Sequence, residues 1–271
     1  MAAASTTLNS ALERRNAGVA SIYWKEAKYE FLTRLRLRAY SLSTIAFPLM
    51  FYVLFGLVIN SRNAPVAGTT ITTYLIATYG CFGVMGASLF GTASGLAAER
   101  GLGWLQVKRA SPMPPFAYFA AKVALGMIFS AIVVVLLLIL GITFGGVRLP
   151  VLDALKLVAV LVTGSLPFCA MGLAIGYFVG PNSAVAVINL IYLPLSFCSG
   201  LWVPIMFLPR LLQQVAHFLP PYHLAQLALS VVGAGQRESN WTHWEALAGF
   251  SLICLGVARI GFQRDEGKNY G

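Results

Sequence analysis

Long stretches of this chain carry no charged side chain, and they limit what the chain can fold into more than any other feature does. The uncharged stretches are 39–61, 63–98, 123–147, 157–209 and 211–236. A helix that crosses a bilayer needs about 20 apolar residues and satisfies its own backbone polar groups. Only 10% of the residues are charged, whereas a typical soluble domain is about 25% charged. The sequence therefore predicts an all-α integral membrane protein.

We predict six transmembrane helices in one membrane domain of residues 1–271. The spans are expected at about 41–60, 74–97, 122–144, 153–179, 184–204 and 245–262. A polar turn at 180–184 divides the longest uncharged stretch into the fourth and fifth spans. Residues 1–40 are then an N-terminal cytoplasmic or interfacial segment, 41–262 the six-helix membrane domain and 263–271 a cytoplasmic tail.

The basic residues predict the orientation, because cytoplasmic loops carry an excess of Lys and Arg. With six spans, residues 1–40, residues 98–122 and the residues after 258 lie on one side and hold 14 of the 19 Lys and Arg residues. Both termini are therefore expected in the cytoplasm. Since topology accounts for the net charge of +10, we expect no nucleic-acid partner.

Residues 21–41, before the first span, have the pattern of an amphipathic interfacial helix. Apolar residues recur at helical spacing, and cations occupy other faces, where they would lie near lipid phosphates of the inner leaflet. The alternative is a solvated basic leader. The residues expected to carry the interfacial role are Trp24, Lys28, Phe31 and Leu35.

Residues 205–233, between the fifth and sixth spans, are apolar but interrupted. Pro220 and Pro221 divide the uncharged run into pieces of about a dozen residues, and proline disrupts a helix interior. Neither piece is long enough to cross a bilayer. We predict two re-entrant half-helices, with a seventh span as the alternative.

The sequence shows no catalytic signature and no source of energy for transport. It contains no G-x-x-x-x-G-K-[ST], H-E-x-x-H or G-x-S-x-G pattern. We therefore expect no enzymatic activity, no bound cofactor and no metal. Ion-coupled carriers typically have buried carboxylates, and we expect none here. Asp153 is instead expected to pair with Lys156 at a helix start. If the chain moves a substrate, its energy comes from another protein.

Residues 97–122 concentrate charge, glycine and proline between the second and third spans, on the cytoplasmic side. The pattern there is Glu-Arg, Gly-Trp-Leu, Lys-Arg and Ser-Pro, followed by Pro114, Pro115 and Lys122. Residues 193–226 add a second pattern, Ser-Gly, Pro204, Leu-Pro and Leu-Pro. In this order and spacing the chain resembles the permeases of the ABC-2 type transporters, in particular the drug-resistance, daunorubicin-exporter-like branch. Gly101-Leu102 stands where that family commonly has a second charged residue.

The resemblance implies a non-catalytic permease subunit of an ATP-binding-cassette exporter in a bacterial inner membrane. Such permeases form dimers, here expected to be homodimers, and bind two copies of a separate ABC ATPase that carries the ATP and Mg²⁺. The loop after the second span is a coupling helix that docks in the ATPase, braced by the N-terminal amphipathic helix. The residues implied in ATPase coupling are Glu99, Arg100, Gly103, Trp104, Leu105, Lys108, Arg109 and Pro112.

The substrate is expected to pass along the dimer interface beside the second and fifth helices. The apolar, aromatic-rich spans favour a hydrophobic or amphiphilic substrate, such as a drug (multidrug efflux), a lipid or a secondary metabolite. Alternatives are an ABC-2 exporter of a saccharide or lipid-linked polymer, a gradient-driven secondary transporter or channel, and an intramembrane enzyme. The possible path residues are Phe82, Met85, Phe90, Asn189, Tyr192 and Phe197.

Overall fold

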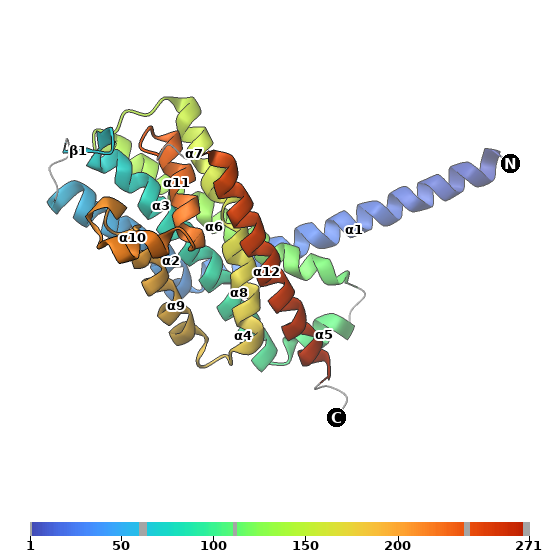
Figure 1. Ribbon diagram of the computed structural model, residues 1–271. Coiled ribbons are helices and arrows are strands. Elements are labelled where there is room, and N and C mark those ends of the chain that lie inside the picture. The colour runs from blue at the N-terminus through green and yellow to red at the C-terminus, as the bar shows by residue number, and fades with distance from the viewer. Residues whose placement is uncertain (1, 60–63, 111–112, 236–238, 268–271) are drawn as a thin grey trace.

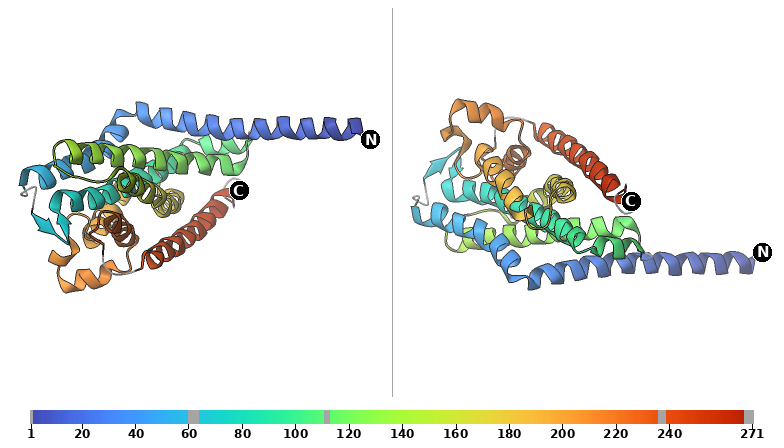
Figure 2. Two further views of the ribbon diagram at one scale, coloured as in Figure 1. Left: turned by 90° about the horizontal axis from the view of Figure 1, so that it is seen from above. Right: turned by 90° about the horizontal axis from the view of Figure 1, so that it is seen from below.

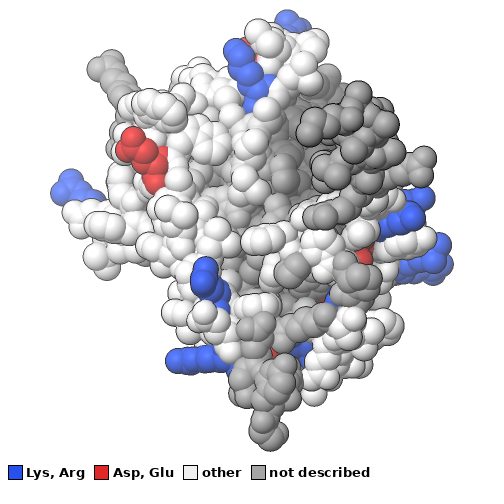
Figure 3. All heavy atoms as spheres, turned by 90° about the vertical axis from the view of Figure 1, so that its right-hand side faces the viewer, with Lys and Arg blue, Asp and Glu red and all other residues white. Residues whose placement is uncertain are grey.

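The computed structural model describes residues 2–59, 64–110, 113–235 and 239–267, and this part of the chain is a bundle of helices with one short hairpin (Figure 1). On the surface seen in Figure 3, Lys and Arg side chains are separated by broad uncharged areas. An all-α membrane protein is consistent with both observations.

The N-terminal helix α1, Ala2–Arg36, projects away from the bundle (Figure 1), and its C-terminal part packs against α6. The helix breaks at Leu37, and the chain continues as α2, Arg38–Phe51, and the π-helical segment η1, Tyr52–Ile59. The helix predicted over 21–41 is therefore present but ends before 41. The first apolar span begins at Arg38, slightly earlier than expected.

The second span is the centre of the bundle. A tight antiparallel hairpin of β1, Pro65–Val66, and β2, Thr69–Thr70, precedes it. The span itself is a continuous run of α3, Ile71–Leu89, the π-helical segment η2, Phe90–Ser94, and α4, Gly95–Gly101. Every residue of α3 is buried, so the other helices are arranged around it.

The remaining long helices surround this central one. After the short helix α5, Trp104–Ala110, the chain forms α6, Pro115–Thr143, then α7, Val151–Thr163, and α8, Leu166–Phe178. The last helix, α12, Asn240–Gly267, packs along α8, and Figure 2 shows it and α1 on separate sides of the bundle.

Five of the six predicted spans correspond to helices that are long and apolar enough to cross a membrane. Within the described residues these helices are Arg38–Ile59, Ile71–Gly101, Phe116–Thr143, Val151–Phe178 and Asn240–Asp265. The fifth predicted span, 184–204, is instead the 15-residue helix α9, Ala184–Cys198. The chain turns at Gly200, whose φ of +73° is in the left-handed region that favours glycine. Six spans therefore stay a prediction.

The segment between α9 and α12 forms short helices, as the double proline predicts. They are the 3-10 turn η3, Ile205–Phe207, and the helices α10, Arg210–Ala216, and α11, Pro220–Val231. Pro220 and Pro221 stand at the start of α11, where a missing backbone N–H costs nothing. Helix α11 is buried against α3, α7 and α12. That these half-helices re-enter the membrane stays a prediction.

Small residues on α8 allow a close approach between two helices of the same chain. A Cβ on Gly172 would collide with the side chain of Thr92 in η2, and one on Gly176 would lie 3.0 Å from the carbonyl oxygen of Ala93. The Gly-x-x-x-Gly pattern of α8 thus serves packing within one subunit.

Gly172→Val should therefore destabilise the bundle. Overpacking a filled contact costs about 1–3 kcal/mol, so the detergent-solubilised variant should melt at a lower temperature than the wild type. Gly256→Val on α12 is the matched control, because no atom lies within 4 Å of its Cβ position. Equal melting temperatures of the two variants would contradict the role given to this contact.

Candidate coupling surface and intramembrane cavity

A glycine turn positions α5 at one end of the bundle. Helix α4 ends after Gly101, and Gly103 adopts a φ of +73°. The amide N–H of Gly103 donates to the carbonyl of Arg100, and the amide of Gln106 donates to the carbonyl of Gly103, both at 3.1 Å. Leu102 therefore caps α4, and α5 begins at Trp104 after the turn.

The two sides of α5 differ. Leu105 is buried with Leu96 and Tyr118 in a small apolar cluster. Trp104, by contrast, is 55% exposed, and Leu102 beside it is 73% exposed. Of the two residues expected to anchor a partner, the structure leaves Trp104 accessible, whereas Leu105 holds α5 onto the bundle.

A fully buried lysine joins three helices behind α5. The Nζ of Lys122 on α6 donates to Glu30 Oε1 on α1 at 2.6 Å and to Glu99 Oε1 on α4 at 2.5 Å. Glu30 is itself buried. A buried ion is retained only where charge partners and hydrogen bonds compensate its lost hydration, so these three helices must stay together at this point.

Lys108 extends this network to α5. Its Nζ lies 2.6 Å from Glu26 Oε1 and 3.7 Å from Glu99 Oε2. Burial alone would lower the pKa of Lys108, but the hydrogen bond to Glu26 and the charges of Glu99 and Glu26 raise it overall. Lys108 therefore stays protonated at neutral pH and links α5 to α1.

Arg100 points to a different set of partners. Its guanidinium donates to Asp265 Oδ1 on α12 and to the carbonyl of Gly176 on α8, both at 2.8 Å. Glu99 and Arg100, both predicted to contact an ATPase, thus make contacts inside this chain. Arg109 lies in α5, but its side chain is not among those that the structure describes. Pro112 lies outside the described residues.

The residues predicted to face lipid on α1 are not equivalent. Phe31 packs against Phe129 of α6, with ring centroids 5.7 Å apart. Trp24 is 71% exposed, and Lys28 and Leu35 are also exposed. The side of α1 that packs on α6 is therefore the one with Glu30 and Phe31.

The expectation that no carboxylate is buried was wrong. Glu30 is buried and Glu99 is largely so, because α1 folds back onto α6 and covers the loop that the sequence assigns to the cytoplasm. The spacing of Glu26, Glu30 and Arg34 at successive helical turns could have indicated one charged face on α1. The predicted pair of Asp153 and Lys156 is confirmed, at 3.0 Å.

Three of the predicted path residues line one cavity of about 520 Å³. Phe90, Asn189 and Tyr192 line it together with α2 residues and Arg34. Asn189 binds its own helix, donating to the carbonyl of Val185 at 3.1 Å. Arg34 was not among the predicted path residues, because it belongs to the segment before the first span.

The other three predicted path residues do not line this cavity. Phe82 is buried behind it, where its ring stacks on that of Tyr192 at 4.8 Å and its carbonyl accepts a hydrogen bond from the Tyr192 hydroxyl. Met85 is also fully buried. Phe197 lies further along α9 against Trp202.

An apolar helical bundle with a lined cavity and a short loop helix fixed at one end is compatible with a membrane transport subunit. The sequence profile of the ABC-2 type transporter family matches residues 23–232. The chain therefore belongs to the ABC-2 type transporter family. It is also 26% identical, over 91% of its length and 99% of the relative's, to "Putative transport permease YvfS" of Bacillus subtilis (strain 168).

Removing the buried cation should destabilise the protein strongly. Lys122→Met leaves Glu30 and Glu99 without their shared partner, and breaking a buried pair costs about 3–5 kcal/mol. We expect a clear drop in melting temperature and yield, partly recovered by adding Glu30→Gln. Lys156→Met, which breaks an exposed pair worth about 0–1 kcal/mol, is the control. If both single variants melt alike, the cluster has no stabilising role.

Proposed function

We propose that this chain is the non-catalytic permease subunit of an ATP-binding-cassette exporter, with α5 as the helix that couples it to a separate ATPase. The observation that carries the proposal is the two-sided character of α5. Leu105 and Lys108 fix the helix to the bundle, while Leu102 and Trp104 are left accessible. Large aromatic side chains are typical anchors of protein interfaces. ATP and Mg²⁺ would be bound by that partner.

The ion networks suit transmission of movement from a partner. Through Lys108, α5 is linked to Glu26 of α1 and to Glu99 of α4. Helix α4 is in turn linked to α6 through Lys122, and to α8 and α12 through Arg100. A push on α5 would thus reach α1 directly, and α6, α8 and α12 by way of the charged residues of α4. Rigid connections of this kind are what allow a local change to move whole elements.

The cavity beside α2, η2 and α9 is the proposed route of a hydrophobic or amphiphilic substrate. Its wall surface is mostly apolar, and its polar groups include Arg34, Asn189 and the hydroxyls of Ser43, Thr44 and Ser94. Exposed apolar residues continue beside it, among them Met50 of α2 and Leu190 of α9. We propose that a second copy covers this face, giving a homodimer with two ATPase subunits.

The proposed topology follows the distribution of basic residues, with α5 and both termini in the cytoplasm of a bacterial cell and six spans in the inner membrane. The proposed single domain then comprises the segment 1–40, the membrane part 41–262 and the tail 263–271. A drug, lipid or secondary metabolite is the substrate class that an apolar cavity favours.

Trp104→Ala should weaken ATPase binding at least tenfold, since removal of an interface anchor costs about 2 kcal/mol. Binding is measured by titrating the reconstituted permease with the purified partner ABC ATPase. Trp241→Ala is the control, because Trp241 is 73% exposed on α12 and lies outside α5. Glu99→Ala should also weaken binding while membrane insertion persists, and it should in addition lower the melting temperature. Unchanged ATPase binding of Trp104→Ala would refute the docking role.

Filling the cavity should block transport without preventing ATPase binding. Val185 lines the cavity, whereas Leu190 on the same helix is 75% exposed and does not. Val185→Trp should reduce ATP-dependent movement of a fluorescent lipophilic dye in vesicles several-fold, and Leu190→Trp should leave it unchanged. Dye transport that continues without the ATPase, driven by a proton gradient, would refute the exporter assignment.

A further inference from the structure

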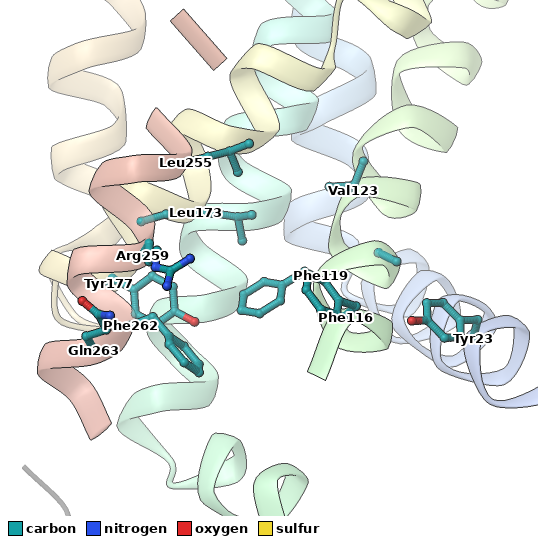
Figure 4. A pocket seen from close by; sticks show the side chains of 12 residues that line it. Tyr23, Phe116, Phe119, Val123, Leu173, Tyr177, Leu255, Arg259, Phe262 and Gln263 are labelled. Atoms are coloured by element: carbon teal, nitrogen blue, oxygen red, sulfur yellow. The ribbon is translucent and has the colours of Figure 1, made fainter. Parts of the chain in front are cut away.

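A second hollow surface lies away from the proposed substrate cavity, between α6 and α12. Two adjoining cavities of about 710 and 490 Å³ form it, with α8 as the floor. They share Val123, Leu173 and Leu255, so they form one continuous groove. Figure 4 shows the larger cavity, at the end of the bundle nearest to Tyr23 of α1. We call this surface the α6–α12 groove.

The groove extends along most of the bundle. The α12 residues that line it begin at Trp244 and end at Gln263, which corresponds to about 29 Å at 1.5 Å per residue. The hydrocarbon core of a bilayer is about 30 Å thick. The lining residues are almost all apolar, so the groove is suited to hydrocarbon rather than to water.

One end of the groove carries a positive charge. Figure 4 shows the side chain of Arg259 pointing from α12 into the space between α12 and α6, near Phe119 and Phe262. Among the side chains that the structure describes, no carboxylate lies within 4.0 Å of this guanidinium, in contrast to Arg100 with Asp265. Gln263 lies at the same end. A phosphate would supply the missing negative partner.

We propose that the α6–α12 groove binds one anionic phospholipid from the leaflet on the α5 side of the membrane. The phosphate lies at Arg259, and an acyl chain lies along α8 toward Leu247. Arg259 and Leu247 are about 18 Å apart along α12, and one leaflet of hydrocarbon is about 15 Å thick. An acyl chain therefore reaches from the charged end into the second cavity.

The size of the groove favours a lipid over a protein helix. A helix with side chains is about 10–12 Å wide, so a 20 Å length occupies about 1,600 Å³ or more. Even taken together, the two cavities are smaller than that. Ligand pockets for small molecules are typically about 300–1,000 Å³, a range that includes both.

The test is to count the lipids that the purified chain retains. The protein is delipidated, reconstituted with equal amounts of phosphatidylglycerol and phosphatidylcholine of the same acyl chains, and analysed by native mass spectrometry. Arg259→Gln should lower retained phosphatidylglycerol about fivefold, corresponding to about 1 kcal/mol for one basic residue, and leave phosphatidylcholine unchanged. Arg264→Gln is the matched control, since Arg264 lines a different pocket with Arg100 and Asp265.

A steric variant tests the acyl part of the groove independently. Ala120 lines the groove and is exposed, so Ala120→Trp should fold normally and reduce retention of both lipids. Normal folding is verified by an unchanged melting temperature and unchanged ATPase binding, so this result is separate from the proposed coupling. Unchanged lipid retention in both groove variants overturns the proposal. A loss of dimers in Ala120→Trp with normal lipid retention also overturns it, because the groove would then be a protein interface.

Discussion

The structure depends most on the buried ammonium group of Lys122. A cation without access to water needs negative partners at hydrogen-bond distance, and here they come from α1 and α4, far apart in sequence. The N-terminal helix is therefore held against the membrane bundle by a requirement for charge balance and by the contact of Phe31 with Phe129. The position of α5 follows, since Glu99 also attracts Lys108.

Adjacent residues on α4 divide the contacts of this end of the bundle between two groups of helices. Glu99 binds Lys122 of α6 and lies near Lys108 of α5, whereas Arg100 binds α8 and α12. Helix α4 is thus held from two directions, just before the turn at Gly103 into α5. For a subunit that is to receive movement from a partner, such bracing keeps the receiving helix in a fixed relation to the bundle.

Much of the fold could be predicted from the sequence, because the uncharged stretches bound the long helices closely. The proline pair likewise predicted the two short helices α10 and α11. The fifth span was placed too long, because hydropathy continues through Leu201 and Trp202 although the backbone turns at Gly200. Apolar composition alone does not distinguish a helix from a buried turn.

The candidate site was predictable only in part. The motif around Trp104 is contiguous, and the resemblance to the ABC-2 permeases implied its place in a loop helix. The partners of Glu99, Arg100 and Lys122 come from distant segments, and no local pattern pairs Arg100 with Asp265. Phe90 and Asn189 were found because they lie on the two predicted cavity helices, whereas Arg34 enters the cavity only through the fold of α1.

The π-helical segment η2 has a consequence for helical phase. A π turn contains an extra residue compared with an α turn, and one residue corresponds to a rotation of about 100° in an α-helix. Segment η2 precedes α4 in one continuous helix. Its wider turn therefore sets the direction around the helix axis in which the side chains of Glu99 and Arg100 point. Phe90, its first residue, also lines the cavity. A segment that lines the cavity thus sets the direction in which the two charged residues of α4 point.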